Sequence, residues 1–294
     1  MRIIISRAVL ASFSFIVFAT QVSAESAPAV SNINSKVSLH SGDDGLSGVV
    51  GSITFPLTHS WGAQVDMATA NHDAGDISFV GGHLFWRNPE KGLVGFLGSK
   101  HSSTYGDTEE LGFQAEKFFA NFTLRAELGY QSNDRRAFVF ADGQSPSPNA
   151  IGSLGTLSVN DDFWAVKGSW YATEDIVAFA KSERSIGRNG HTSIGLEWQI
   201  GSTNNVGYSL YSEYKDVDGY GTQGLIGFRM YFDGKKNLKT RHRTADPAVS
   251  YDASGYPTCP PGYELSTSGG GFTISTSCVG TGPFGFPGGF GGMN

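Results

Sequence analysis

Judged by type and spacing, two kinds of residue in this sequence could take part in chemistry. The first is histidine, aspartate or serine close together in sequence, in the segments SGDDG (41–45), NHDAGD (71–76) and HSS (101–103). A hydrolase would need such a histidine within hydrogen-bond reach of an acid or a nucleophilic serine. The same residue types are common in turns, and neither a GxSxG nor an HExxH motif occurs. We therefore predict no catalytic residue and no metal site, and keep a hydrolase sited at the rim of the fold as an alternative.

The second kind is a charged residue in a segment where polar and apolar residues alternate. Glu197, for example, lies between Leu196 and Trp198. A β-strand turns successive side chains to opposite faces, so this alternation separates charged from apolar residues. The residues predicted on the charged face are Asp66, His83, Glu116, Arg125, Glu127, Lys167, Glu197, Glu213 and Arg229.

Charges on the inside of a barrel can serve in two ways. Around a water-filled lumen they create a field that selects solutes, whereas in a narrow lumen they pair with one another and fill it. The predicted set contains five acids and three bases besides one histidine, so an open lumen would carry a net charge of −2 and mildly favour cations. The sequence leaves both uses open.

Twelve segments of about ten residues must position these charges. The predicted strands are Lys36–Gly42, Leu46–Phe55, Trp61–Ala70, Ile77–Trp86, Leu93–Ser102, Glu109–Phe119, Phe122–Gln131, Asp162–Tyr171, Ile176–Arg184, His191–Ile200, Val206–Lys215 and Thr222–Phe232. Connections after even-numbered strands are short, and those after odd-numbered strands are on average longer. This pattern predicts an all-β fold, a transmembrane antiparallel up-and-down β-barrel of about 12 strands with a mostly irregular C-terminal extension.

Apolar residues at every second position of the predicted strands indicate which face of the sheet meets lipid. A water-soluble barrel would turn its aromatic side chains inward. Here we expect the charged side chains on the inner face and the aromatic side chains on the outer face. Trp61, Trp86, Trp170 and Trp198 all fall at the strand ends that short connections join. Amphipathic aromatic side chains prefer the level of the lipid headgroups, so this placement supports a membrane barrel.

From about Lys36 to Phe232 the chain resembles a Gram-negative outer-membrane β-barrel of the porin-like superfamily. The resemblance rests on the strand pattern and on the aromatic-ended last segment GLIGFRMYF (224–232), and no motif indicates a subfamily. It implies an outer-membrane location with both chain ends in the periplasm, and contacts with membrane lipids, lipopolysaccharide and the outer-membrane assembly machinery. It implies no cofactor and leaves a homo-oligomer open.

The resemblance also implies a function. We expect a porin-like channel for small hydrophilic solutes or a structural barrel, with a surface adhesin acting through its outer loops as a further alternative. In such proteins a long outer loop can fold inward. In the predicted loop Ser132–Asp161, Arg135 and Arg136 would then add positive charge at a constriction; the other interpretation is a solvent-exposed loop.

The start of the chain indicates export. Arg2 and Arg7, an apolar run at 8–19 and a small-x-small site ending at Ala24 predict a signal peptide over residues 1–24. Its removal leaves 19 basic residues against 27 acidic ones, a net charge near −8. That balance argues against nucleic acid as a partner.

The segments outside the predicted barrel have polar compositions. Residues 25–35 are predicted to be a flexible lead-in, 233–247 a basic linker, and 248–294 a Gly/Pro/Ser-rich periplasmic tail. Cys259 and Cys278 are the only cysteines, and in an exported protein such a pair predicts one disulfide.

Overall fold

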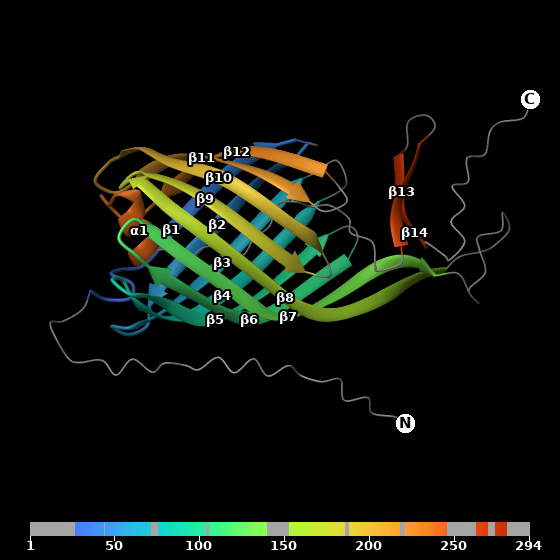
Figure 1. The fold of residues 1–294 in the computed structure, drawn as a ribbon, viewed down its shortest axis with the longest axis horizontal. Coiled ribbons are helices and arrows are strands. Elements are labelled where there is room, and N and C mark those ends of the chain that lie inside the picture. Colours follow the sequence, from blue (N-terminus) through green and yellow to red (C-terminus); the bar gives the residue numbers. More distant parts are fainter. Residues whose placement is uncertain are drawn as a thin grey trace, which may run out of the picture.

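The computed structural model describes residues 27–43, 45–71, 76–103, 106–139, 153–185, 188–217, 221–245, 263–269 and 274–280. Twelve of its strands close into one antiparallel barrel, in which each strand pairs with its neighbours in sequence (Figure 1). They are β1 (Asn34–Gly42), β2 (Ser47–Pro56), β3 (Trp61–Asn71), β4 (Ile77–Asn88), β5 (Gly92–Ser103), β6 (Gly106–Phe118), β7 (Phe122–Val139), β8 (Ser153–Thr173), β9 (Ile176–Ser185), β10 (Arg188–Ser202), β11 (Gly207–Val217) and β12 (Gly221–Tyr231).

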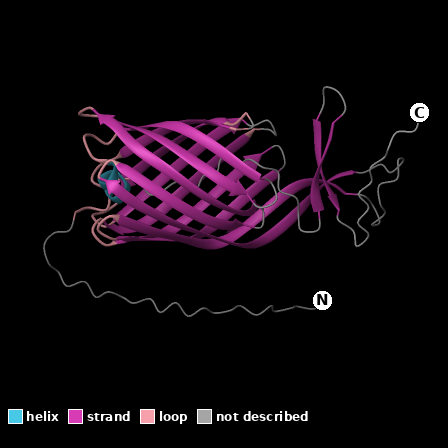
Figure 2. Ribbon diagram, turned by 45° about the horizontal axis from the view of Figure 1, so that its top comes forward, coloured by secondary structure: helices cyan, strands magenta, loops and turns pink. Residues whose placement is uncertain are grey.

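The barrel closes where β1 pairs with β12. Lys36 lies opposite Tyr231 and Gly42 lies opposite Leu225, so the ladder is continuous along this seam. The predicted antiparallel up-and-down barrel of twelve strands is therefore confirmed. Figure 2 shows the closed wall of tilted strands from a second direction.

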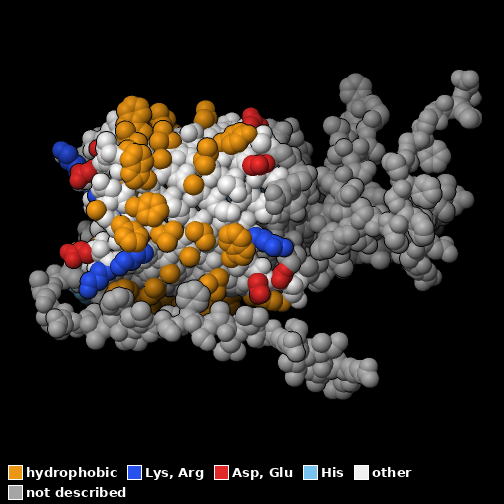
Figure 3. Space-filling view, viewed as in Figure 1, with side chains coloured by type: hydrophobic (Ala, Val, Ile, Leu, Met, Phe, Trp, Pro, Cys, Tyr) orange, Lys and Arg blue, Asp and Glu red, His pale blue; other side chains and the backbone are white. Residues whose placement is uncertain are grey.

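Side chains alternate between the two faces of the wall as the sequence pattern predicts. In β3, Gln64 and Asp66 are buried, whereas Val65 and Met67 between and after them are exposed. The outer face carries large apolar side chains, with Leu111 and other residues up to 69% exposed. Figure 3 shows these apolar side chains over the middle of the visible face and charged ones toward the two ends. Such a surface is stable against lipid and would aggregate in water.

Aromatic side chains gather at the end of the barrel where β2 leads into β3. Trp61 pairs in register with Trp86, and Phe122 pairs with Trp170. Trp198 on β10 is also exposed, at 50%. We call this the short-turn end, and the placement agrees with an aromatic girdle at a membrane interface.

Strand lengths differ from the prediction at the opposite end. β7 continues to Val139 and β8 begins at Ser153, so the predicted loop Ser132–Asp161 is largely a pair of strands that extends past the rest of the barrel (Figure 1). About ten residues are enough to cross a membrane. Polar residues beyond that length still pair because the backbone ladder does not depend on an apolar face.

Two further elements follow the barrel. Helix α1 (Leu238–Thr244) lies at the short-turn end. β13 (Tyr263–Gly269) and β14 (Ile274–Gly280) pair with each other in a two-stranded sheet. Within the described residues, no helix has the length and hydropathy needed to cross a membrane. The predicted signal peptide falls outside the described residues, as do Cys259 and most of the predicted irregular extension, and the disulfide stays a prediction.

Candidate functional site: the barrel lumen

A chain of polar contacts fills the side of the lumen formed by β2 to β6. Thr54 donates to the Oε1 atom of Gln64 at 2.8 Å, and the amide of Gln64 donates to Oδ1 of Asp66 at 2.8 Å. Oδ2 of Asp66 lies 3.0 Å from Nε2 of His83, whose Nδ1 lies 3.1 Å from Oε1 of Gln114. Because buried polar groups need partners, this network holds the side chains in place. Asp66 and His83, both predicted as inward-facing, thus meet each other.

The network continues onto β7 through Arg125. Its guanidinium donates to Gln114 at 3.3 Å, forms an ion pair with Glu127, and lies 3.8 Å from Glu116. Both carboxylates therefore share one buried cation. An arginine with several acceptors is fixed in orientation, because its planar guanidinium has donors in set directions.

A second network lies across the lumen, around Glu197 on β10. One carboxylate oxygen accepts from Arg229 at 2.7 Å and the other accepts from the hydroxyl of Tyr231 at 2.6 Å. Arg229 also donates to Ser38 at 2.8 Å. Nε2 of His242, on helix α1, lies 3.6 Å from Glu197. The helix is thereby linked to the charged wall of the lumen.

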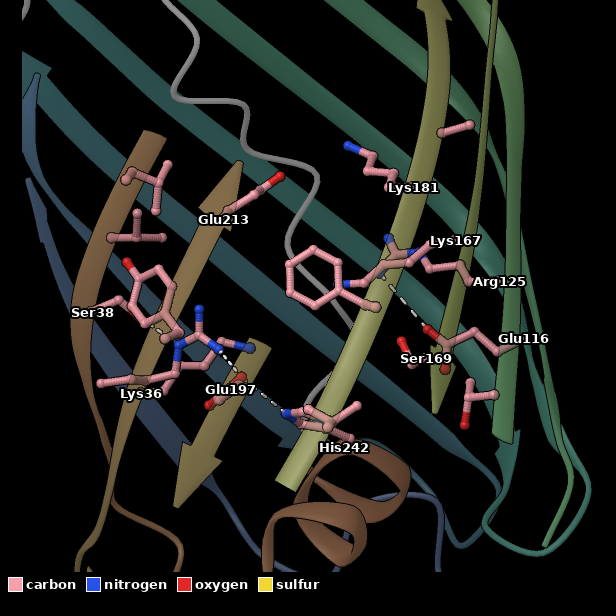
Figure 4. Close-up of a pocket in the computed structure, with 18 of the residues that line it drawn as sticks. Lys36, Ser38, Glu116, Arg125, Lys167, Ser169, Lys181, Glu197, Glu213 and His242 are labelled. Atoms are coloured by element: carbon pink, nitrogen blue, oxygen red, sulfur yellow. Dashed lines mark hydrogen bonds and ion pairs between the residues drawn. The ribbon is translucent and has the colours of Figure 1, made fainter. Parts of the chain in front are cut away.

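A cavity of about 230 Å³ lies between these networks (Figure 4). Its lining mixes charged side chains with apolar and aromatic ones, among them Val177, Phe179 and Leu225. The charged residues that line it are Lys36, Glu116, Arg125, Glu127, Lys167, Lys181, Glu197, Glu213, Lys215 and Arg229. Seven of the nine residues predicted to line a lumen are in this group, and Asp66 and His83 belong to the neighbouring network.

The charge balance of the cavity differs from the predicted one. Sequence reasoning left out Lys36, Lys181 and Lys215, so the cavity is lined by six bases and four acids, a net charge of +2 without the histidines. The lining of this cavity therefore differs in sign from the predicted net charge of −2, and the cation preference drawn from that charge stays a prediction. Alternation along the strands was sufficient to predict these lysines. Lys215, for example, is two residues from Glu213 and so lies on the same face of β11.

Helix α1 covers the short-turn end of the lumen, where the sequence predicts a solvated basic linker. Asn237 caps the helix by accepting from the backbone N–H of Thr240 at 2.8 Å. Leu238 is fully buried in a cluster with Tyr171, Val177 and Tyr231. Burial of one such leucine stabilises the docked helix by about 2 kcal/mol.

Arg241 holds the helix against the end of the barrel. It is 0% exposed, forms an ion pair with Asp233, and donates to the carbonyl of Gly234 at 2.7 Å and to Gln199 at 3.2 Å. Its guanidinium also lies 5.0 Å from the centre of the Tyr231 ring. A buried cation with this many partners holds the helix in one position.

The other basic residues of α1 fasten it to neighbouring turns. Arg243 donates to the carbonyls of Phe119 and Phe122, and Lys239 donates to Asn121 at 3.0 Å. Partial burial lowers the pKa of Arg243 below its ordinary value, although arginine stays charged at physiological pH. The basic stretch thus binds the turn that joins β6 to β7.

The segment before β1 fills the rest of this end. Ala29 and Val30 are buried, and Val30 packs with Phe85, Leu93 and Phe118. Arg87 donates to the carbonyl of Ala29 at 3.1 Å. Part of the predicted flexible lead-in is therefore packed, at Ala29 and Val30, whereas residues 31–33 are exposed.

The residues considered for hydrolase chemistry do not form a base–nucleophile pair where they are described. His101 faces inward against Phe79, and its Nε2 lies 3.6 Å from Glu110. The nearby hydroxyl of Ser99 donates to Glu110 at 2.8 Å rather than to the imidazole. Asp43 accepts from the backbone N–H of Gly224, on β12, at 2.7 Å. Residues 44 and 72–75 lie outside the described part.

The remaining predicted positions can be placed only by their backbone. Arg135 and Arg136 lie in β7, paired with Leu157 and Thr156 of β8. Their side chains are outside the described part, so a role at a constriction stays a prediction. Among the described residues no group of histidine, cysteine and acidic side chains could hold a metal ion.

Comparisons with known proteins concern the architecture alone. No protein-family model matches the sequence, and no curated protein matches it. Among solved structures, the COG4313 outer membrane channel from Pseudomonas putida F1 is similar at 10% identity and a TM-score of 0.46, over 72% of this chain and 99% of that one. The KdgM porin in complex with disordered oligogalacturonate is similar at 8% identity and a TM-score of 0.45, over 67% and 97%.

A third solved structure, the NanC porin, is similar at 11% identity and a TM-score of 0.44, over 68% of this chain and 99% of that chain. The chain's own geometry decides its class: a closed sheet of twelve antiparallel strands, apolar outside and charged inside. It has the fold of a closed, antiparallel up-and-down β-barrel whose outer face suits lipid.

Proposed function

We propose that this protein is an outer-membrane channel for small hydrophilic solutes, and that helix α1 closes its short-turn end in the state seen here. The observation that carries the proposal is the cavity of about 230 Å³ inside a barrel whose outer face suits lipid. A lumen whose only task was structural would be filled by packed side chains. A charged lining around open space instead favours water and polar solutes.

The position of α1 supports a closed state of a channel. The helix comes after the last barrel strand, so its removal from the lumen would break no strand pairing. Its contacts with the wall are mainly ion pairs and hydrogen bonds, such as that of Arg241 with Gln199. Contacts of this kind re-form with water when a segment moves away.

A structural barrel is the second candidate, and the filled half of the lumen favours it. The network from Thr54 to Gln114 occupies the inner face of β2 to β6. A barrel that only anchors other components would need no more than this. Transport distinguishes the two candidates.

The test is solute entry into liposomes that contain the purified full-length protein. We expect slow swelling in glycerol and no swelling in a trisaccharide, since the cavity is narrow. The control is liposomes without protein. If neither the full chain nor a variant with a displaced α1 admits glycerol, the structural barrel is the better explanation.

Orientation gives a separate prediction. A barrel of this class has its short turns in the periplasm, and the turn between Phe119 and Phe122 is at the short-turn end. An epitope tag at Gln144, between β7 and β8, should bind antibody on intact cells, whereas a tag at Ala120 should bind only after permeabilisation. The reverse result would invert the proposed topology.

A further inference from the structure

A row of basic residues crosses the inner wall where the cavity lies. On β7, β8 and β9, Arg125 is directly opposite Lys167, and Lys167 is directly opposite Lys181. The same row continues through Ser193 on β10 to Lys215 on β11. Like charges directly opposite one another destabilise a sheet unless something offsets them.

Three cations of the row have a carboxylate on their own strand and face. Arg125 forms an ion pair with Glu127, and Lys181 forms one with Glu183. Nζ of Lys215 lies 4.0 Å from Glu213. In each case the acid is two residues away, which is the spacing that returns a strand to the same face.

Lys167 is the exception. The residues two positions away on its strand are Ala165 and Ser169, neither of which carries a charge. Among the described residues, no acidic oxygen lies within ion-pair distance of its ammonium group, which instead lies 4.1 Å from the centre of the Phe179 ring. Figure 4 shows Lys167 beside Arg125 at the cavity wall. The central cation of the row thus has an aromatic ring as its near contact and, in the part of the chain that the structure describes, no carboxylate within ion-pair distance.

Two glycines make room for aromatic rings at the cavity wall. A side chain at Gly195 would overlap the Phe179 ring, so the glycine allows that ring to lie against the wall. Gly227 makes the same room for the ring of Tyr211. Both rings line the cavity, and a larger residue at either glycine would push a ring into it.

We propose that Lys167 anchors a binding site for small solutes that carry two or more carboxylates. The four acids that line the cavity already contact basic side chains, Glu116 and Glu127 through Arg125, Glu197 through Arg229 and Glu213 through Lys215. A bound solute therefore meets the surplus positive charge. Neighbouring strands are about 4.8 Å apart, so a multivalent anion reaches Lys167 and an adjacent cation together. The solute's route depends on the proposed channel function, but its binding does not.

The experiment is a calorimetric titration of the detergent-solubilised full chain with citrate, at low ionic strength. We expect Lys167→Gln to weaken citrate binding about tenfold or more, as for loss of one hydrogen bond to a charged group. Acetate should bind far more weakly than citrate, because it reaches one cation only. Lys117→Gln is the matched control, since Lys117 is exposed on the outside of β6, and its citrate affinity should equal that of the wild type.

A second variant tests the missing carboxylate directly. Ala165→Glu supplies an acid where the other cations of the row have one, and should abolish citrate binding while Lys167 is still present. Ala165→Gln, similar in size but neutral, should retain binding; a heat-dependent shift in gel mobility verifies that each variant is a folded barrel. Unchanged citrate affinity in both Lys167→Gln and Ala165→Glu would overturn the proposal. A wild type that admits glycerol but does not bind citrate would overturn it and leave the channel function standing.

Discussion

Replacement of Arg241 by alanine is expected to convert a barrel closed by α1 into one that conducts steadily. Arg241 is fully buried, and its loss removes its ion pair with Asp233 and its hydrogen bond to Gln199, although Lys236 stays 3.5 Å from Asp233. Removal of one partner from a buried ion pair costs about 3–5 kcal/mol. A change of about 3 kcal/mol shifts an equilibrium by more than a hundredfold. The measurement is single-channel open probability of the purified full-length protein in planar bilayers.

The control for this prediction is Thr240→Ala, because Thr240 is exposed on the same helix and only its backbone takes part in the cap. Its open probability should match that of the wild type. Both variants should assemble normally, since no barrel strand is altered. An Arg241→Ala protein that is folded but as silent as the wild type would argue that α1 is a permanent part of the wall.

Leu128→Arg is expected to impair membrane assembly far more than Glu127→Gln, although the two residues are adjacent on β7. Leu128 is 55% exposed on the outer face, whereas Glu127 is 9% exposed and faces the lumen. A charge on the lipid face costs about 2–4 kcal/mol near the bilayer midplane. Glu127→Gln removes one of two carboxylates near Arg125, and Glu116 remains 3.8 Å from it.

Heat-modifiable gel mobility of outer-membrane fractions measures the assembled share of each variant. Equal assembly of Leu128→Arg and Glu127→Gln would show that the assignment of faces on β7 is incorrect. Glu127→Leu separates charge from shape, since it places an apolar residue on the inner face. It should assemble less well than Glu127→Gln because leucine, unlike glutamine, offers the buried guanidinium of Arg125 no hydrogen-bond acceptor.

The sequence was sufficient to predict the barrel and its two faces. A period of two is a local property, present in each segment before any strand finds its partner. The residues around Glu197, with Leu196 and Trp198 exposed on either side of it, show the alternation that the structure has. The predicted strands were too short at β7 and β8, because the alternation of polar and apolar residues fades beyond the apolar part of the wall while backbone pairing continues.

The closure of the short-turn end was not evident in the sequence. A helix as short as α1 is marginal by itself in water, and its residues Leu238 and Arg241 give no lasting period to detect. They become buried only because the end of the barrel offers Tyr231, Gln199 and Asp233. The packing of Val30 depends in the same way on a surface formed by distant strands.

The arrangement of charges across neighbouring strands of the lumen was decided by tertiary structure. Parity predicts that Arg125, Lys167 and Lys181 can face inward, but it does not say which residue stands opposite which. Strand register fixes that, and register follows from the turns and from closure of the whole sheet. Only in the closed barrel do these three cations form one row with Lys167 at its centre, held by a ring and no acid among the described residues.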